Sequence, residues 1–208
     1  MTFIVEYISN YCECGGGFER YFVKGPSSDN YLKFSREELN DDNLTRSWVN
    51  SVGNSKRALH LQVEMICKVF GWDSLYTKKI IGFPKRLNFL EKCGIINPRI
   101  LAKINKNRNK IEHDYYFPSS DEAQDYADIV ELFISATDKY IERFPSTIDF
   151  ELMDDDNSLG LPKLIEVEIE IETGGINIIS DDKTLKNIDI KDKEYFMWLS
   201  AVINQYQL

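Results

Sequence analysis

The chain has 208 residues, of which 43% are hydrophobic and 12% aromatic, and its formal net charge is -9. This composition predicts a folded core, as one domain or one domain with a small appendage, and argues against a disordered chain or a generic nucleic-acid coat protein. No apolar run approaches the ~18 residues that span a bilayer, and the chain start lacks the features of a signal peptide. We therefore expect a cytoplasmic protein without membrane contact.

The first part of the chain, residues 1–34, is β-like. Apolar runs at 3–8 and 18–23 predict two strands that flank three consecutive glycines at 15–17, and the run Gly-Pro-Ser-Ser at 25–28 predicts a turn or loop. A third short strand is a candidate at 31–34. We expect these segments to be short and to lie outside the main helical region.

The second part, residues 35–145, predicts a helical bundle. Ser35, with a glutamate three residues later, predicts a capped helix start, and Gly71 predicts the end of a long helix that begins near Leu44. Ser119 or Ser120 predicts the cap of a later helix, which ends before Pro145. Two helices are expected between these, at 84–94 and 98–116. Together they predict an up-and-down bundle of four or five helices.

Apolar periodicity supports these helices. The expected buried residues of the long helix and of the later helix are Leu59, Val63, Ile66, Cys67, Phe70, Ala123, Tyr126, Ala127, Val130, Phe133, Ile134 and Tyr140.

The third part, residues 146–208, predicts a linker, a β-hairpin and a terminal helix that packs on the bundle. Strict alternation of isoleucine or valine with glutamate at 165–172 predicts a strand with one wet face, paired with 176–179. A closing helix is expected at 193–206, with its inward residues Tyr195, Trp198, Leu199 and Val202. The predicted fold class is therefore α+β and mainly α, a helical bundle with short β segments at both ends. The β-like ends could join into one sheet beside the bundle, and the sequence leaves this open.

The four cysteines and two histidines limit metal chemistry. Cys12 and Cys14 are one residue apart, but no second pair follows, so structural thiols are favoured over a zinc site. With only His60 and His113, a centre of several histidines within one chain is excluded. We expect no metal and no cofactor.

Basic residues gather in one segment of this acidic chain. Between Lys78 and Lys110 there are ten lysines and arginines and one acid, Glu91, so the segment carries +9 and the remainder carries -18. A local anionic ligand would suit this arrangement. A solvated helix face that balances the protein's own acids would suit it equally well, and charge alone leaves both interpretations open.

Arg108 and His113 are the candidate functional residues of this segment. Arg108 falls on the apolar stripe of the helix expected at 98–116, where a guanidinium requires an anion or an acidic partner such as Asp125 or Asp128. His113 lies five positions later, about 140° round the helix, so the two do not share a face. Asn109 does share a face with His113. A second copy of the helix across a two-fold axis could bring two such sets into one cleft.

The run 108–113, Arg-Asn-Lys-Ile-Glu-His, resembles the motif of the HEPN superfamily, in which an arginine, a polar residue and a histidine lie late in a helix of a helical bundle. The resemblance covers roughly residues 35–144. It implies a metal-independent endoribonuclease that acts on RNA as a homodimer and leaves a 2′,3′-cyclic phosphate.

The resemblance also implies roles for individual residues. His113 would be the general acid/base, and Arg108 would hold the scissile phosphate. Asn109 would orient His113 or donate to a phosphate oxygen. Lys106 or Lys110 would add attraction to the RNA backbone. The alternatives are a non-catalytic module of this class that binds RNA, nucleotide or a protein partner, and a subunit for protein interactions only.

Tyr115 extends the resemblance. Arg-x4-His-x-Tyr is similar to the toxin of the HEPN/MNT toxin–antitoxin pairs, in which a nucleotidyltransferase partner can adenylylate the tyrosine. This implies a toxin or anti-phage defence effector, a nucleotidyltransferase-type or other antitoxin, and Tyr115 as a regulatory modification site. The alternative is a tyrosine packed on the apolar stripe.

Overall fold

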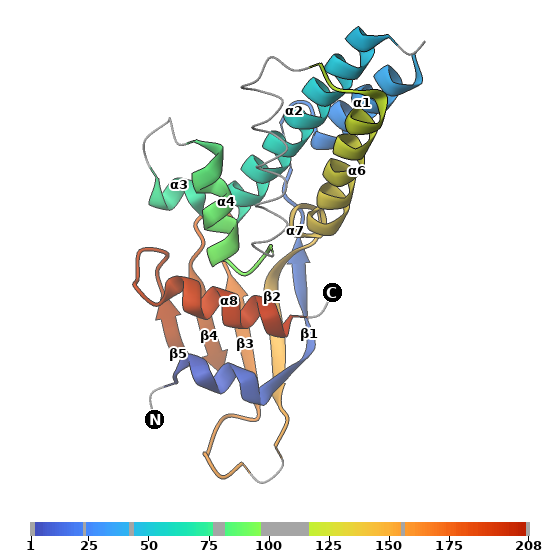
Figure 1. The fold of residues 1–208 in the computed structure, drawn as a ribbon. Coiled ribbons are helices and arrows are strands. Elements are labelled where there is room, and N and C mark those ends of the chain that lie inside the picture. Colours follow the sequence, from blue (N-terminus) through green and yellow to red (C-terminus); the bar gives the residue numbers. More distant parts are fainter. Residues whose placement is uncertain are drawn as a thin grey trace.

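Strands from both ends of the chain form one antiparallel sheet in the computed structural model, which describes residues 3–22, 24–41, 44–76, 82–96, 117–154 and 157–206. Within these ranges the sheet has five strands in the order β1-β2-β3-β4-β5 (Figure 1). The strands are β1 (Tyr11–Glu19), β2 (Phe144–Leu152), β3 (Leu164–Ile169), β4 (Ile176–Ser180) and β5 (Lys183–Ile188).

The strand predicted from alternating isoleucine, valine and glutamate is confirmed as β3, although it ends at Ile169. Its apolar residues Ile165, Val167 and Ile169 are buried, and the glutamates between them are half-buried. The predicted hairpin is confirmed as well, because β3 pairs antiparallel with β4. A period of two thus places one face of this strand in the core, as expected.

The prediction for the N-terminal segment is wrong. Residues Val5–Asn10, in the first expected strand, form a 3₁₀ helix, η1, and the glycines expected between two strands lie inside a single strand, β1. Gly16 has φ +145, and a Cβ there would stand 2.3 Å from the Thr147 carbonyl oxygen on β2. The pairing of β1 with β2 is irregular on both sides of these glycines. They therefore mark a bulged, close approach of two strands rather than a chain reversal.

A helical part of the chain is inserted between β1 and β2. Helices α1, α2 and α6 lie side by side, and the shorter helices lie nearer the sheet (Figure 1). Their bounds are α1 (Ser28–Asn40), α2 (Thr45–Val69), α3 (Trp72–Leu75), α4 (Phe83–Lys92), α6 (Ser120–Thr137) and α7 (Lys139–Glu142).

The long helix and the later helix are confirmed as α2 and α6. All the residues expected on their buried stripes are buried, although Tyr140 belongs to α7. Ser119 caps α6 in a capping box with Glu122. The helix expected at 84–94 is confirmed as α4, with Leu87, Phe89 and Leu90 buried. The helix expected at 98–116 lies outside the described residues.

The predicted start of the first helix is wrong. Helix α1 begins at Ser28, and its cap is Ser27, which forms a capping box with Asn30. The short strand expected at 31–34 is therefore helical. Ser35 is fully buried inside the helix instead of capping it, and its hydroxyl bonds to the hydroxyls of Ser51 and Ser55 on α2.

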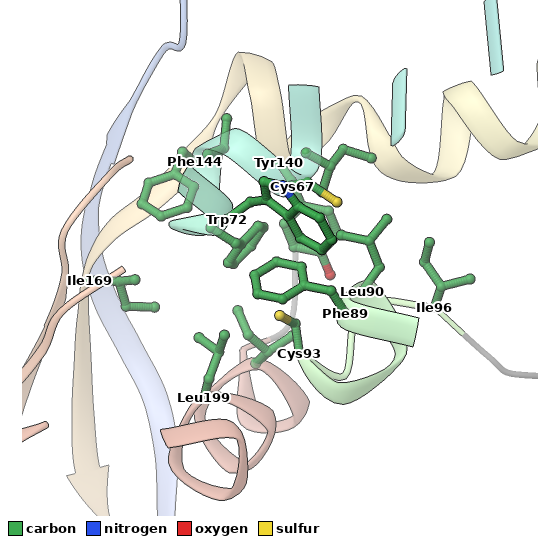
Figure 2. Packing of buried hydrophobic residues seen from close by; sticks show 14 of the residues in the cluster. Cys67, Trp72, Phe89, Leu90, Cys93, Ile96, Tyr140, Phe144, Ile169 and Leu199 are labelled. Carbon is green, nitrogen blue, oxygen red and sulfur yellow. The ribbon is translucent and has the colours of Figure 1, made fainter. Parts of the chain in front are cut away.

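The closing helix is confirmed as α8 (Tyr195–Gln205), and its four expected inward residues are buried. It crosses one face of the sheet and packs against η1, β1 and α4 (Figure 1). Trp198 is 1% exposed and its ring stacks on Phe3 at 6.2 Å between centroids. A core therefore lies between the sheet, α8 and α4, and Figure 2 shows aromatic and aliphatic side chains that fill it.

The predicted fold class, a mainly helical bundle with short β segments at its ends, is wrong. The two β-like ends pair with one another through β1 and β2, from Tyr11 opposite Leu152 to Glu19 opposite Phe144, and make a central sheet. Local periodicity detects single strands, whereas this pairing joins residues separated by more than half of the chain. In the described ranges, no helix is long and apolar enough to cross a membrane.

The C-terminal end of α2 is fixed to the turn between β3 and β4. The Glu172 backbone N–H donates to the Val69 carbonyl oxygen at 3.0 Å. Gly71 follows with φ +85, and a Cβ at this position would stand 2.6 Å from the Thr173 carbonyl oxygen. This junction connects the helical part to the sheet without room for a larger residue.

Candidate functional site

The residues proposed from the sequence fall outside the described ranges. These residues are Lys106, Arg108, Asn109, Lys110, His113 and Tyr115. The structure describes the chain on either side of them. Helix α4 ends at Lys92 before them, and α6 begins after them at its Ser119 cap.

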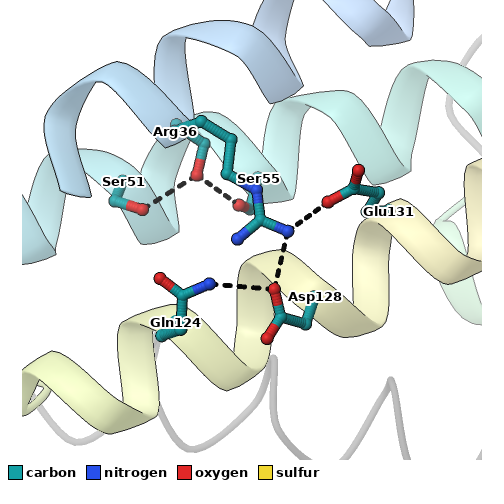
Figure 3. A network of polar contacts seen from close by, with 7 residues as sticks. Arg36, Ser51, Ser55, Gln124, Asp128 and Glu131 are labelled. Atoms are coloured by element: carbon teal, nitrogen blue, oxygen red, sulfur yellow. Dashed lines mark hydrogen bonds and ion pairs between the residues drawn. The ribbon is translucent and has the colours of Figure 1, made fainter. Parts of the chain in front are cut away.

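One alternative for Arg108 was an ion pair with Asp125 or Asp128 on the next helix. The structure gives Asp128 another partner, since the Arg36 guanidinium of α1 lies 2.6 Å from its carboxylate and also binds Glu131 (Figure 3). Gln124 donates to Asp128 as well, at 2.9 Å. This charged network therefore joins α1 to α6.

The described residues do form a second candidate site, a cleft of about 920 Å³. Two segments far apart in the sequence supply most of its lining, namely the connection between β1 and α1 and the C-terminal half of α2. Ligand sites in proteins commonly have this volume. The lining residues are Glu19, Arg20, Tyr21, Phe22, Lys24, Pro26, Tyr31, Lys56, Arg57, His60, Leu61, Glu64, Met65, Lys68, Ile171 and Glu172.

Helix α2 contributes a row of polar side chains at four-residue intervals, namely Lys56, His60, Glu64 and Lys68. This spacing places them on one face of the helix over about 18 Å. The Lys68 ammonium lies 3.8 Å from Glu64. The His60 ring stacks on Phe83 of α4 at 4.2 Å between centroids, which fixes the plane of the imidazole.

The connection between β1 and α1 contributes a cation next to an exposed ring. Phe22 is 79% exposed, and the Arg20 guanidinium lies 5.8 Å from its ring centroid. Arg20 also pairs with Glu142 of α7 at 2.6 Å, and the Tyr21 backbone N–H donates to the Ile141 carbonyl oxygen at 2.8 Å. These contacts hold the connection against α7 beside the cleft.

The cleft is positive although the protein is negative. Its lining has five lysines and arginines against three glutamates, a surplus of two cations. In the part of the chain that the structure describes, neither Lys24 nor Arg57 forms an ion pair, and Arg57 donates only to Asn54 at 2.9 Å. Burial and the Glu172 carboxylate raise the pKa of Tyr21. The arrangement can therefore neutralise an anion and offer it aromatic surface.

Sequence reasoning missed this cleft. Its cations are divided between residues 20–24 and 56–68, and the net charge of each segment is only +2, against +9 for 78–110. The available signal was the interleaving of cations and aromatic rings at 20–24, together with the four-residue spacing on α2.

The cysteines divide into an exposed pair and a buried pair. Cys12 and Cys14 are exposed on β1, whereas Cys67 and Cys93 are buried. Burial, with the nearby Asp149 carboxylate, raises the pKa of the Cys14 thiol. Among the described residues, no three or more histidine, cysteine, aspartate or glutamate side chains are grouped so that they could hold a metal ion.

No family model, no curated protein and no solved structure matches the chain.

Proposed function

We propose that the protein is a metal-independent endoribonuclease of HEPN type. The observation that carries the proposal is the sequence Arg-Asn-Lys-Ile-Glu-His at 108–113, which lies in the segment that carries +9 on a chain of net charge -9. Further support comes from the helices on either side of it in the sequence, since α2 packs on α4 and also on α6, whose start is capped at Ser119.

The chemistry requires a base, an acid and a cation. His113 takes the proton from the RNA 2′-hydroxyl, whose oxygen attacks the adjacent phosphorus, and a protonated histidine supplies the proton for the departing 5′-oxygen. Arg108 binds the phosphate and offsets the charge that develops on it. The products are a 2′,3′-cyclic phosphate and a 5′-hydroxyl end. Histidine, with a reference pKa of ~6.5, serves both proton transfers near neutral pH.

The proposed active form is a homodimer in the cytoplasm. Arg108 and His113 lie about 140° apart on an ideal helix, so two copies related by a two-fold axis would supply complementary halves of the site. Asn109 orients His113, and Lys106 and Lys110 attract the RNA backbone. A toxin or defence role, with an antitoxin that modifies Tyr115, belongs to the same proposal.

Cleavage of total tRNA and of a labelled single-stranded RNA in EDTA tests this function. We expect the wild type to cleave and to leave cyclic-phosphate ends. His113→Ala should lose at least 100-fold in rate, because proton transfer contributes about 10²–10⁴-fold. Arg108→Ala should also lose at least 100-fold, because removal of one group that stabilises the developing charge costs about 10²–10³-fold. Arg99→Ala is the matched control, since it removes the same charge from the same segment and should retain activity.

An absence of cleavage by the folded dimeric wild type would contradict the proposal, provided that intact mass shows no adduct on Tyr115. Equal loss in Arg99→Ala would also contradict it, because the effect would then be one of charge. The second candidate function is a non-catalytic module that binds RNA, nucleotide or a protein partner. The basic cleft on α2 favours it. It predicts binding without cleavage in the wild type as well as in His113→Ala, whereas the nuclease loses turnover in His113→Ala and keeps its affinity for RNA.

A further inference from the structure

We infer that the cleft between α2 and the β1–α1 connection binds single-stranded nucleic acid, with phosphates at Lys24 and Arg57 and a base stacked on Phe22. The cleft is separate in sequence from residues 108–113. The inference requires neither His113 nor cleavage, and it goes beyond the proposed catalytic function.

The charges of the cleft favour an anionic ligand. Its surplus of two cations stands on a protein of net charge -9, so an anion is attracted here and repelled over much of the remaining surface. Lys24 and Arg57 are the cations most available to a ligand, since neither has an ion-pair partner among the described residues. Arginine and lysine side chains without an acidic partner can bind phosphate oxygens at no cost of breaking an existing pair.

The aromatic surface of the cleft favours a ligand with unpaired bases. A single exposed phenylalanine is ordinary on a protein surface. Phe22, however, is 79% exposed where it lines a basic cleft, and Arg20 lies beside its ring. Rings placed next to cations along a groove are the usual means of holding unpaired bases, because every base can stack whatever its sequence.

The shape and the total charge select a single strand over a duplex. Bases inside a duplex are already stacked and would not reach Phe22, whereas an unpaired base can. Lys56 and Lys68 stand at the two ends of the polar row on α2, about 18 Å apart along the helix, a spacing that spans more than one phosphate of a strand. A duplex would also bring its phosphates against the acidic remainder of the protein.

Fluorescence anisotropy with a labelled U-rich 12-nucleotide RNA tests the inference, in EDTA and with His113→Ala in every protein so that the strand stays intact. The variant Lys24→Glu/Arg57→Glu should bind at least tenfold more weakly. The plot of the logarithm of its association constant against the logarithm of the salt concentration should be less steep by about 1.4, because two phosphate contacts are lost. Phe22→Ala should bind about tenfold more weakly. Because the Phe22 side chain is mostly exposed, its removal leaves the fold intact.

The matched control is Lys183→Glu/Lys191→Glu, which changes the charge equally at two exposed positions outside the cleft. It should keep nearly the affinity of the parent. Equal weakening in this control, or unchanged binding in both cleft variants, would overturn the inference. Displacement of the strand by free UMP at the same molar affinity would overturn it in favour of a mononucleotide site.

A third result would overturn the nucleic-acid assignment in favour of a general anion site. In that result Lys24→Glu/Arg57→Glu weakens binding, Phe22→Ala does not, and inorganic polyphosphate competes as well as RNA. Binding and cleavage are measured separately. A protein that binds through the cleft but never cleaves RNA would contradict the proposed function and support this inference, and the reverse result would do the opposite.

Discussion

Replacement of Gly71 by alanine should destabilise the protein by about 3 kcal/mol. Gly71 has φ +85, where an L-residue costs about 1–2 kcal/mol. Its Cβ would also stand 2.6 Å from the Thr173 carbonyl oxygen and 2.7 Å from Ile190 Cδ1, and such overpacking costs about 1–3 kcal/mol. Because the nearest atom is backbone, rotation of a side chain cannot relieve the contact. In thermal unfolding the loss should appear as a fall in Tm of roughly 6–12 °C.

Alanine substitutions at two other glycines separate the conformational cost at Gly71 from the cost of the steric clash. Gly160 has φ +62 and Gly53 lies within α2, and an added Cβ meets nothing within 4 Å at either position. Gly160→Ala should cost only the conformational part, about 1 kcal/mol. Gly53→Ala should stabilise the protein by about 0.5–1 kcal/mol, because alanine is the better helix former.

Urea unfolding followed by tryptophan fluorescence measures all three variants. The comparison that matters is between Gly71→Ala and Gly160→Ala, because their difference isolates the clash with the β3–β4 turn. A Gly71→Ala variant no less stable than Gly160→Ala would refute the tight junction between α2 and the sheet.

Two further predictions concern buried hydroxyl groups. The Ser35 hydroxyl lies 2.8 Å from the Ser51 hydroxyl and 2.7 Å from the Ser55 hydroxyl, so Ser35→Ala leaves both of these buried groups without their shared partner. The free energy of unfolding should fall by about 1–3 kcal/mol in the same urea assay, and no change would contradict this network. Burial raises the pKa of Tyr11 to about 12, whereas an unfolded tyrosine ionises near pH ~10. The unfolded state therefore loses this proton first, and stability that is present below pH 10 is lost as the pH rises to about 12. Tyr11→Phe should flatten this fall in urea titrations between pH 9 and pH 12, and an unchanged dependence of stability on pH would refute the role of Tyr11. The substitution also removes a 2.8 Å hydrogen bond to the Pro162 carbonyl oxygen, which lowers stability equally at pH values where Tyr11 is protonated.

The elements that the sequence predicted correctly are those that depend on local spacing. Helix α2 follows from its apolar stripe and from Gly71, α6 from its Ser119 cap, and β3 from strict alternation. In each case the pattern that decides the structure lies within the element or next to it.

The failures depend on partners that are distant in the sequence. The glycines at 15–17 suit a turn and a bulge equally, and only Thr147 on the neighbouring strand decides between them. Ser35 and Ser27 both stand three residues before a side chain that can complete a capping box, and packing of Ser35 against α2 decides which one caps. The basic cleft is likewise assembled from two distant segments, so no single window of sequence reveals it.

Insertion of the helical part between two neighbouring strands has a consequence for the order of folding. Strands β2, β3, β4 and β5 are joined by connections much shorter than the helical insert and can pair soon after the chain collapses. Strand β1 can join them only when Glu19 meets Phe144, after closure of a loop that contains more than half of the chain. The helical insert has to form before these two ends come close, so the edge of the sheet is completed late, and the cleft beside it takes its final shape in the same step.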